Sequence, residues 1–563
     1  MTGALSHRGR VEWLDWRSDG ATAADGSSNS HETIVAEWSA WMRDPAAFAS
    51  RLEGAFAVAA LDRAGGRLVL ARDRLGEKPL YYTAGPTGVA FASEIKALRA
   101  AGVVADLSLS PEALDAYLAF TYVPAPRTIF SAVHKVPAGH CVVFDLRGLA
   151  EGSPGATETN RYWKLPDRNG ADSSPEEMLG ILRDAVERRM PASGPVVTFL
   201  SGGLDSSVVA ALASRELGRR VTAFSIGFPQ ARLDESGHAR RVAALVGAEH
   251  RLIMLESVEP DLVVRVIRQL DEPMADPATI PTYVLAREAS AVGDVVMTGD
   301  GADALLAGDH WFRRLQRLDA MERWPRPLRE TVCLFAALGG PSRRKKAVAL
   351  AALLDLAPAE RYLRIREKWT LEERLDAYDG GFRSGLDTAA TAATYVHAPV
   401  DWREGESVDA AIRLDTIHGL PEALLMKADK MGNAHGVESR SPFLDRRLAE
   451  WAARLDIGLL IRGGASKYLL KKTAESLLPR DLIYRRKHGF QIPLAAWLKG
   501  CLRDLTGAAF SPDLIRRQGI FDPAAIARLE SRFRAGEAAP ALAGQVWQIV
   551  AFQTWWTDVF GGR

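Results

Sequence analysis

Residues 201–207 read SGGLDSS (Ser201-Gly202-Gly203-Leu204-Asp205-Ser206-Ser207) and decide the fold of the larger part of the chain. The apolar run at 196–200 (VVTFL) predicts a strand before them, and residues 208–217 continue after them as a helix. Glycines let a backbone come close to a polyanion, a helix start offers unpaired N–H groups, and serines add hydroxyl donors. We therefore predict a phosphate-binding loop, in which Asp205 holds Mg²⁺ against the phosphates.

This loop contains no lysine, unlike the G-x-x-x-x-G-K-[ST] phosphate loop. The alternative interpretation is an ordinary glycine-rich turn between a strand and a helix. SGGLDSS in this strand–helix setting is much more specific than a lone GxGxxG. It is similar to the pyrophosphate loop of enzymes that cleave ATP between its α and β phosphates.

Strands and helices alternate along the chain after about residue 175. Further strands are predicted at 221–228 (VTAFSIGF), 251–255 and 294–298, and helices at 238–246 and near 262–270. This order predicts a doubly wound parallel sheet that binds ligands at the carboxyl ends of its strands. From about residue 305 the composition is mostly helical, with tryptophans clustered near 547–556.

A second polar cluster, Thr298-Gly299-Asp300-Gly301-Ala302-Asp303, follows the strand predicted at 294–298. In a doubly wound sheet this cluster would lie beside the first loop, and Asp303 is a candidate second Mg²⁺ ligand. The alternative is a Gly/Asp turn that caps a helix starting near Ala302, because aspartate is a good N-cap residue.

Charged residues are also dense at 427–445 (KADKMGNAHGVESRSPFLD), which includes Glu438. Lys467 lies in ASKYLLKK, and Arg485, Arg486 and Lys487 precede HGF. Surface helices are charged as well, so each of these clusters is also compatible with a solvated face.

The N-terminal part follows a different pattern. Short β-like runs between Leu52 and Leu98 are separated by Gly and Pro turns, which predicts an antiparallel sheet. The polar stretch 148–160 (GLAEGSPGATETN) reads as an interdomain linker. We predict one domain over residues 1–150, a linker over 151–174 and a second domain over 175–563.

Composition excludes several classes of protein. The chain has 563 residues, with 71 Lys and Arg and 70 Asp and Glu, which gives a formal charge of +1. This net charge does not attract the protein to nucleic acid or to an anionic membrane. Cys141, Cys333 and Cys501 are too few and too far apart for a disulfide scaffold. The N-terminus lacks the apolar segment of a signal peptide, and the longest apolar run, 347–354, is too short to span a bilayer. We expect a cytoplasmic protein that binds no nucleic acid and has no membrane span.

Taken together, these motifs resemble the type B asparagine synthetase superfamily, over nearly the whole chain after residue 30. The pieces similar to its N-terminal amidotransferase domain are 51–62 (RLEGAFAVAALD), 71–82 (ARDRLGEKPLYY) and 91–98 (FASEIKAL). Those similar to its interdomain region are 123–130 (VPAPRTIF) and 136–140. Those similar to its synthetase domain are SGGLDSS, 271–283 (DEPMADPATIPTY), ESRSPFLD and KHGFQIPLAAWL. The resemblance implies an α/β chain with two domains. Residues 1–150 would form a degenerate type 2 glutamine amidotransferase-like (Ntn) antiparallel β/α domain. Residues 175–563 would form an ATP-pyrophosphatase synthetase domain with a doubly wound parallel sheet and a helical C-terminal part.

The resemblance also implies an activity. Such an enzyme adenylates a carboxylate with ATP and Mg²⁺, and an amine then attacks the acyl-adenylate to give an amide, AMP and pyrophosphate. ATP would be bound by Leu200, Ser201, Gly202, Gly203, Leu204, Asp205, Ser206 and Ser207, with Ile226, Thr298 and Gly299 along the adenosine. Asp205 and Asp303 match the metal-binding aspartates. Lys467 matches a lysine that stabilises charge as the adenylate collapses, and Glu438 is a candidate to orient or deprotonate the amine.

The N-terminus departs from the family. A working glutaminase domain begins with a cysteine after the initiator Met, whereas this chain has Thr2, and MTGALSHRG resembles a later segment of the family. The segments that hold glutamine and its oxyanion have no counterpart between Arg10 and His31, and Ser30 stands where an aspartate should bind the glutamine ammonium. We therefore expect glutamine hydrolysis to be lost.

Without a glutaminase the amine must come from elsewhere. Two branches of the superfamily, β-lactam synthetases and lasso peptide cyclases, let an amine of the same molecule close a lactam. Asp300, our third catalytic candidate, stands where the β-lactam formers have tyrosine and asparagine synthetases have glutamate, and GDGADALLAG looks more like the lasso pattern. The helical stretch from about 309 to 415 could build a peptide site.

We therefore favour a lasso peptide macrolactam synthetase. Its substrate would be a peptide or small-molecule carboxylate, and its partners would include a precursor peptide and a leader protease. The alternatives are a β-lactam-type cyclase, an ammonia-dependent asparagine or amide synthetase and, outside enzymes, an ATP-binding pseudoenzyme.

Overall fold

A five-stranded parallel sheet forms the centre of the larger domain in the computed structural model. The strand order is β11 (Glu249–Met254), β10 (Val221–Gly227), β9 (Val196–Phe199), β12 (Val295–Met297) and β13 (Glu438–Arg440), and every neighbouring pair is parallel. The chain runs outward from β9 through β10 to β11 and then crosses to β12 on the other side of β9. The order therefore reverses between β9 and β12, which is where open α/β sheets bind ligands.

The structure describes residues 2–6, 43–63, 65–85, 88–104, 106–147, 158–337, 341–396, 400–403, 405–486, 491–537 and 541–561. Ser30, the region between Arg10 and His31, Lys487 and the first part of the predicted linker, 151–157, lie outside the described residues.

Helices cover both faces of the parallel sheet because its side chains alternate between two apolar cores. Val196, Ala223 and Met297 belong to one core, which α8 (Ser236–Val246) covers. The other core, which α10 (Thr279–Ala289) covers, contains their neighbours along the strands, Val197, Phe224 and Val296. These strands are buried on both sides, so they appear in the sequence as continuous apolar runs.

The N-terminal domain is antiparallel, as the sequence predicted, but its described strands form two sheets instead of one. One has the order β2 (Ala57–Asp62), β3 (Arg67–Arg72), β7 (His140–Asp145), β8 (Glu158–Arg161), and the other β1 (Thr2–Ser6), β5 (Gly88–Ala92), β4 (Tyr81–Gly85), β6 (His134–Lys135). A shared apolar core that includes Leu68, Leu70, Val89 and Phe91 lies between them. Strand β8 shows that part of the range predicted as a linker pairs with this domain.

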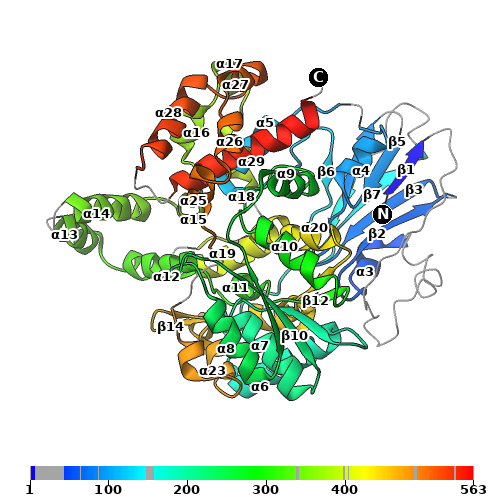
Figure 1. Ribbon diagram of the computed structural model, residues 1–563, viewed down its shortest axis with the longest axis vertical. Coiled ribbons are helices and arrows are strands. Elements are labelled where there is room, and N and C mark those ends of the chain that lie inside the picture. Colours follow the sequence, from blue (N-terminus) through cyan, green and yellow to red (C-terminus); the bar gives the residue numbers. More distant parts are fainter. Residues whose placement is uncertain are drawn as a thin grey trace.

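The remaining helices lie around these sheets (Figure 1). Those before residue 300 are α3 (Pro45–Ala49), α4 (Ile95–Ala100), α5 (Pro111–Phe120), α6 (Pro175–Arg189), α7 (Leu204–Ala211) with the π-helical turn η2 (Leu212–Glu216), and α9 (Pro260–Gln269). Those up to residue 444 are α11 (Ala302–Leu305), α12 (His310–Glu322), α13 (Arg326–Ala337), α14 (Pro341–Leu354), α15 (Pro358–Arg366), α16 (Leu371–Ala377), α17 (Gly380–Ser384), α18 (Thr388–Val396), α19 (Ser407–Leu414), the π-helical η3 (Asp415–Leu425), α20 (Met426–Asn433) and η4 (Pro442–Leu444).

The C-terminal part is helical, as predicted. It contains α21 (Arg446–Arg454), α22 (Ile457–Leu460), the short hairpin β14 (Ile461–Arg462) and β15 (Ala465–Ser466), α23 (Tyr468–Ala474), α24 (Arg480–Ile483), α25 (Leu494–Lys499), α26 (Arg503–Ala509), α27 (Pro512–Gln518), α28 (Pro523–Arg534) and α29 (Leu542–Phe560). Trp547 and Trp555 of α29 are buried in the core of this helical group. Figure 1 shows α13 and α14 projecting from one side of the molecule. Among the described residues, none of the helices has both the length and the apolar composition needed to cross a bilayer.

Candidate active site

The loop at 201–207 connects β9 to α7 and is held by its own serines. The Gly203 N–H donates to Ser201 Oγ over 3.2 Å, and the Ser207 hydroxyl donates to the Gly203 carbonyl over 2.6 Å. Gly202 has φ +71°, and a Cβ added there would lie 2.6 Å from the Ala239 nitrogen. Only glycine fits at this position, which explains the glycine in the motif.

A cavity of about 1140 Å³ opens between this loop and the end of β12. Most of the predicted nucleotide, metal and catalytic residues line it: Leu200, Ser201, Gly203, Leu204, Asp205, Ser206, Ile226, Thr298, Gly299, Asp300, Asp303 and Lys467. Gly202 and Ser207 are buried behind the loop and support it instead. The two polar clusters of the sequence therefore meet at the reversal point of the sheet.

Lys467 joins the two aspartates from these clusters. Its Nζ lies 2.6 Å from both carboxylate oxygens of Asp205 and 2.7 Å from Asp303 Oδ1. The Lys467 side chain is only 6% exposed, so its ammonium attracts both carboxylates through a partly desolvated space. Lys467 has φ +52°, in the left-handed region, where the chain turns from β15 into α23.

Two glycines make room for this cluster. A Cβ at Gly308 would lie 2.0 Å from Asp303 Oδ1 and 2.1 Å from Lys467 Cε. A Cβ at Gly299 would lie 2.7 Å from the Asp205 Cβ. Any larger residue at either position would displace the charged side chains.

The donor set fits Mg²⁺. Asp205 and Asp303 direct carboxylate oxygens at one point, now taken by the Lys467 ammonium, at the mouth of a loop built for phosphates. Mg²⁺ prefers such oxygen ligands and usually takes one or two carboxylates together with substrate phosphates.

Asp300 faces the same cavity. Its Oδ2 accepts a hydrogen bond from Thr298 Oγ1 over 2.9 Å. Burial raises the pKa of the Asp300 carboxyl above its ordinary value of 3.8, and the positive charge of Lys427 opposes this only in part. Lys427 is itself held by Asp276, with 2.7 Å between Nζ and Oδ2.

Glu438 is not brought to the cavity with the other candidates. Its neighbours Val437 and Ser439 line the cavity, but residues along a strand alternate between faces, so the Glu438 side chain points the other way. Its carboxylate accepts a hydrogen bond from Arg440 over 2.8 Å and lies 3.7 Å from Lys78 of the N-terminal domain. This position does not support the predicted role beside the amine.

Sequence reasoning missed three residues of the cavity wall. The guanidinium of Arg366 stacks over Trp311, 3.9 Å from the ring centroid, and Trp311 Nε1 donates to Asp415 Oδ2 over 2.9 Å. All three line the cavity, although they come from separate helices, α15, α12 and η3. No short-range pattern links positions so far apart in the chain.

Arg485, one of the basic residues before HGF, fixes the phosphate-loop backbone. Its Nη2 donates to the Gly202 carbonyl over 2.9 Å, and its Nη1 lies 2.5 Å from Glu235 Oε1. Arg486 lines the cavity. Arg485 and Arg486 are therefore part of the site and not only a solvated face.

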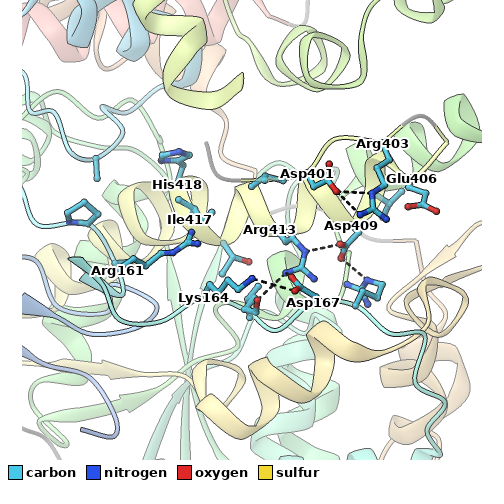
Figure 2. A pocket seen from close by; sticks show the side chains of 18 of the residues that line it. Arg161, Lys164, Asp167, Asp401, Arg403, Glu406, Asp409, Arg413, Ile417 and His418 are labelled. Atoms are coloured by element: carbon cyan, nitrogen blue, oxygen red, sulfur yellow. Dashed lines mark hydrogen bonds and ion pairs between the residues drawn. The ribbon is translucent and has the colours of Figure 1, made fainter. Parts of the chain in front are cut away.

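A second, larger cavity of about 1890 Å³ lies between the N-terminal domain and the helices from α12 to η3. Figure 2 shows that its acidic and basic side chains pair along one wall, as in Asp401–Arg403 and Asp409–Arg413, while Ile417 and His418 lie toward the other end. Helix η3 separates the two cavities: Thr416, Ile417 and His418 line this one, and Gly419 and Leu420 line the first.

Cys141 lies in the N-terminal domain and is fully buried in strand β7. Burial raises the pKa of its thiol to about 11, so the reactive thiolate is scarce at neutral pH. No other cysteine precedes it in the printed sequence.

Comparisons with known proteins agree with this architecture. Residues 177–557 match the family described as "Asparagine synthase", and residues 19–163 match the "Glutamine amidotransferase domain". "Asparagine synthetase [glutamine-hydrolyzing] 1" of Bacillus subtilis (strain 168) is 33% identical over 460 residues, 80% of this chain and 70% of the relative. "Putative asparagine synthetase [glutamine-hydrolyzing]" of Mycobacterium bovis is 31% identical over 542 residues, 95% of this chain and 80% of the relative. "Amidase chry2" of Gibberella zeae is 26% identical over 81% of this chain and 72% of the relative. The chain therefore belongs to the asparagine synthase family and is an ATP-dependent, amide-forming ligase.

Proposed function

We propose that this ligase activates a carboxylate of a peptide and closes a macrolactam with an amine of the same peptide, as lasso peptide cyclases do. The observation that carries this proposal is the second cavity, about 1890 Å³, across helix η3 from the nucleotide cavity. Small-molecule sites usually measure about 300–1,000 Å³, so this space suits a peptide better than a single amino acid. Its paired acidic and basic side chains can contact backbone amides and charged residues alike.

The loop at 201–207 binds the ATP phosphates in this proposal. Backbone N–H groups at the start of α7 and the hydroxyls of Ser201 and Ser206 face the cavity, and Arg485 holds the loop from behind. Ile226, Thr298 and Gly299 line the part that would receive the adenosine.

Asp205 and Asp303 would hold Mg²⁺, which would neutralise phosphate charge when bound. Lys467 is paired with both aspartates, which hold its ammonium in the cavity beside the phosphate loop. A fixed cation beside the α-phosphate stabilises negative charge as it develops.

The reaction then has two steps. An oxygen of the substrate carboxylate attacks the α-phosphorus, the bond to the bridging oxygen breaks and pyrophosphate leaves. The amine nitrogen then attacks the acyl carbon, the bond to the AMP oxygen breaks, and one amine proton must be removed. Asp300 is our proposed acceptor of that proton, because its raised pKa makes the carboxylate a stronger base than an exposed aspartate.

The proposal includes no glutamine hydrolysis by this chain. Cys141 is buried with a raised pKa, which argues against it as a substitute nucleophile. An amine on the same molecule needs no ammonia source, and good positioning makes its attack effectively unimolecular. A precursor peptide released from its leader by a partner protease would be the substrate.

Asparagine formation is the second candidate, because the Bacillus and Mycobacterium relatives described above, at 33% and 31% identity, are named asparagine synthetases. A single assay separates the two. The protein is incubated with Mg-ATP and either a peptide with a free N-terminus and an internal Asp or Glu, or L-aspartate with ammonium or glutamine. Pyrophosphate and product mass are then measured.

A peptide product that lacks one water supports the macrolactam proposal. Asparagine formed from aspartate and ammonium would overturn the macrolactam proposal. Glutamate released from glutamine would show that the chain still hydrolyses glutamine. A Cys141→Ser variant controls for any residual glutaminase signal.

A further inference from the structure

Arg366 ends helix α15 in the wall of the nucleotide cavity, and neither the phosphate loop nor the aspartate cluster uses it. Its side chain is 19% exposed, and its guanidinium lies flat over Trp311 at 3.9 Å. A stacked arginine is held in one plane, so little freedom is lost when its N–H groups bind a planar partner.

Asp415, the nearest acidic residue, does not occupy these donors. Its Oδ2 accepts the Trp311 Nε1 hydrogen bond at 2.9 Å, and its Oδ1 accepts the Tyr362 hydroxyl. Arg366 Nη2 lies 3.6 Å from Asp415 Oδ1, beyond hydrogen-bond distance. Within the described part of the chain, the Arg366 guanidinium makes this ion pair and the ring contact and no hydrogen bond.

One side of the guanidinium faces a glycine of η3. Gly419 of η3 lies beside it, where an added Cβ would stand 3.5 Å from Arg366 Nη2. Because glycine has no side chain, η3 leaves the space at position 419 open, and its contact with the guanidinium is the ion pair from Asp415. Both residues line the nucleotide cavity.

We propose that Arg366 binds a carboxylate of the substrate through its free N–H groups. A carboxylate matches the planar fork of an arginine and forms two charge-assisted hydrogen bonds with it. Asp415, with both oxygens engaged, holds the arginine in place without competing for those donors. This deepens the proposed function, and it rests only on activation of a carboxylate, not on the source of the amine.

Two carboxylates could fill this position: the one that is activated, or a second one on the same substrate. Arg366 is linked to the reacting end of the cavity through Trp311, three residues after Gly308, which touches Asp303 and Lys467. Both choices share the same chemistry at Arg366, and the experiment below separates them.

The test measures binding of acetate and of succinate to the full chain by saturation-transfer NMR. Mg²⁺ and α,β-methylene-ATP are present throughout, so that phosphates already occupy the 201–207 loop and Lys467. Arg366→Met is compared with Arg364→Met on the same helix, whose side chain is 48% exposed. Arg366→Lys keeps the charge beside Asp415 but loses the fork.

We expect the dissociation constant of the probe to rise at least about tenfold in Arg366→Met, by an intermediate factor in Arg366→Lys, and by less than twofold in Arg364→Met. Affinity for the ATP analogue should stay constant in all variants. If Arg366→Met weakens acetate and succinate binding equally, Arg366 binds the carboxylate that is activated. If it weakens succinate binding alone, Arg366 binds a second carboxylate of the substrate.

Unchanged succinate affinity in Arg366→Met, or no saturable binding to the wild type, overturns the proposal. A purely structural Arg366 would lower the melting temperature of Arg366→Met while leaving probe affinity intact. The double variant Arg366→Met/Asp415→Asn removes the unpaired charge, so it restores folding but not binding if the proposal holds. Because no amine is added, these results do not depend on whether the enzyme forms a macrolactam.

Discussion

Lys467 is held in an unusual position for a lysine. A non-glycine residue at φ +52° costs about 1–3 kcal/mol and persists only where the surroundings fix it. The ion pairs to Asp205 and Asp303 provide that restraint. The left-handed turn at Lys467 places its ammonium in the cavity.

Lys467→Ala should lower kcat for pyrophosphate release by about 10²–10³-fold, because a preorganised charge at the reacting phosphate is lost. The dissociation constant of ATP should change much less. The control is Lys472→Ala in α23, the helix that follows Lys467; the Lys472 side chain is partly exposed and pairs with Glu475. Near-normal turnover in Lys467→Ala would remove this residue from the mechanism.

Asp300→Asn should lower kcat by about 10²-fold or more, because the base is removed. In the wild type, activity should fall on the acid side with a pKa above 3.8, and this limb should vanish in the variant. The folded chain binds this proton more tightly than the unfolded chain, so stability falls as pH rises from 3.8 through the folded pKa.

The Asp300 carboxylate therefore costs stability at neutral pH. Asp300→Asn should melt at a higher temperature than the wild type at pH 7 while turning over more slowly. Calorimetry and pH–rate profiles measure the two effects. A lower melting temperature together with an unchanged pH profile would contradict the assignment.

Gly308→Ala should reduce turnover by at least about tenfold with little loss of fold, because its Cβ would displace Asp303 and the Lys467 side chain. Gly180→Ala is the matched control: an exposed helix glycine with open space around it, where alanine should stabilise by about 1 kcal/mol. The Mg²⁺ concentration required for half-maximal rate should rise only in Gly308→Ala.

At the scale of elements, the sequence predicts strands well where they are apolar and buried on both faces. The runs at 196–200, 221–228 and 294–298 form β9, β10 and β12, and SGGLDSS forms the turn between β9 and α7. Strand β13 escapes prediction because its three residues, Glu438–Arg440, are charged or polar, and only pairing with β12 defines them.

The site residues show the same difference between what local sequence predicts and what only tertiary packing defines. Motifs locate Asp205, Asp303 and Lys467, which meet in space. Glu438 was assigned by its position in a motif, but the pleat of β13 turns it toward Lys78. Arg366 carries no motif at all, because its role depends on which helix packs beside Trp311.

The loop between β9 and α7 depends on Arg485 for its shape. Arg485→Ala should raise the KM for ATP about tenfold and leave kcat within a few-fold, because the Gly202 carbonyl and Glu235 lose a shared charged partner. Arg516→Ala, at an exposed pair with Asp513, is the control. A drop in kcat without a change in KM would assign Arg485 to the chemistry instead.

At the scale of the whole molecule, buried charges join the two domains. Glu422 of η3 accepts a hydrogen bond from Arg72 Nη1 over 2.8 Å and lies 3.1 Å from Lys135 Nζ, which also pairs with Glu272. Burial alone would raise the pKa of Glu422, but Arg72 and Lys135 together hold it below its ordinary value of 4.5. Two basic residues of one domain thus neutralise two acids of the other.

Glu422→Ala should lower the free energy of unfolding by about 3–5 kcal/mol, because two buried cations lose a partner. The native contribution of Glu422 is complete above pH 4.5 and is lost as pH falls through its lower folded pKa. Urea titrations at pH 7 and pH 3.5 should therefore differ less in the variant than in the wild type. An equal pH dependence in both proteins would contradict this role.

The Arg72–Glu422–Lys135 contacts bear on how such a gene can evolve. If the N-terminal domain no longer hydrolyses glutamine, selection for that chemistry stops, yet the domain still cannot be shed. Its deletion would remove the counterions of Glu272 and of Glu422, which lies on η3, the helix that walls the nucleotide cavity. Point mutations can accumulate in such a domain, but its loss is selected against, so the descendant keeps the domain after the ancestral reaction is gone.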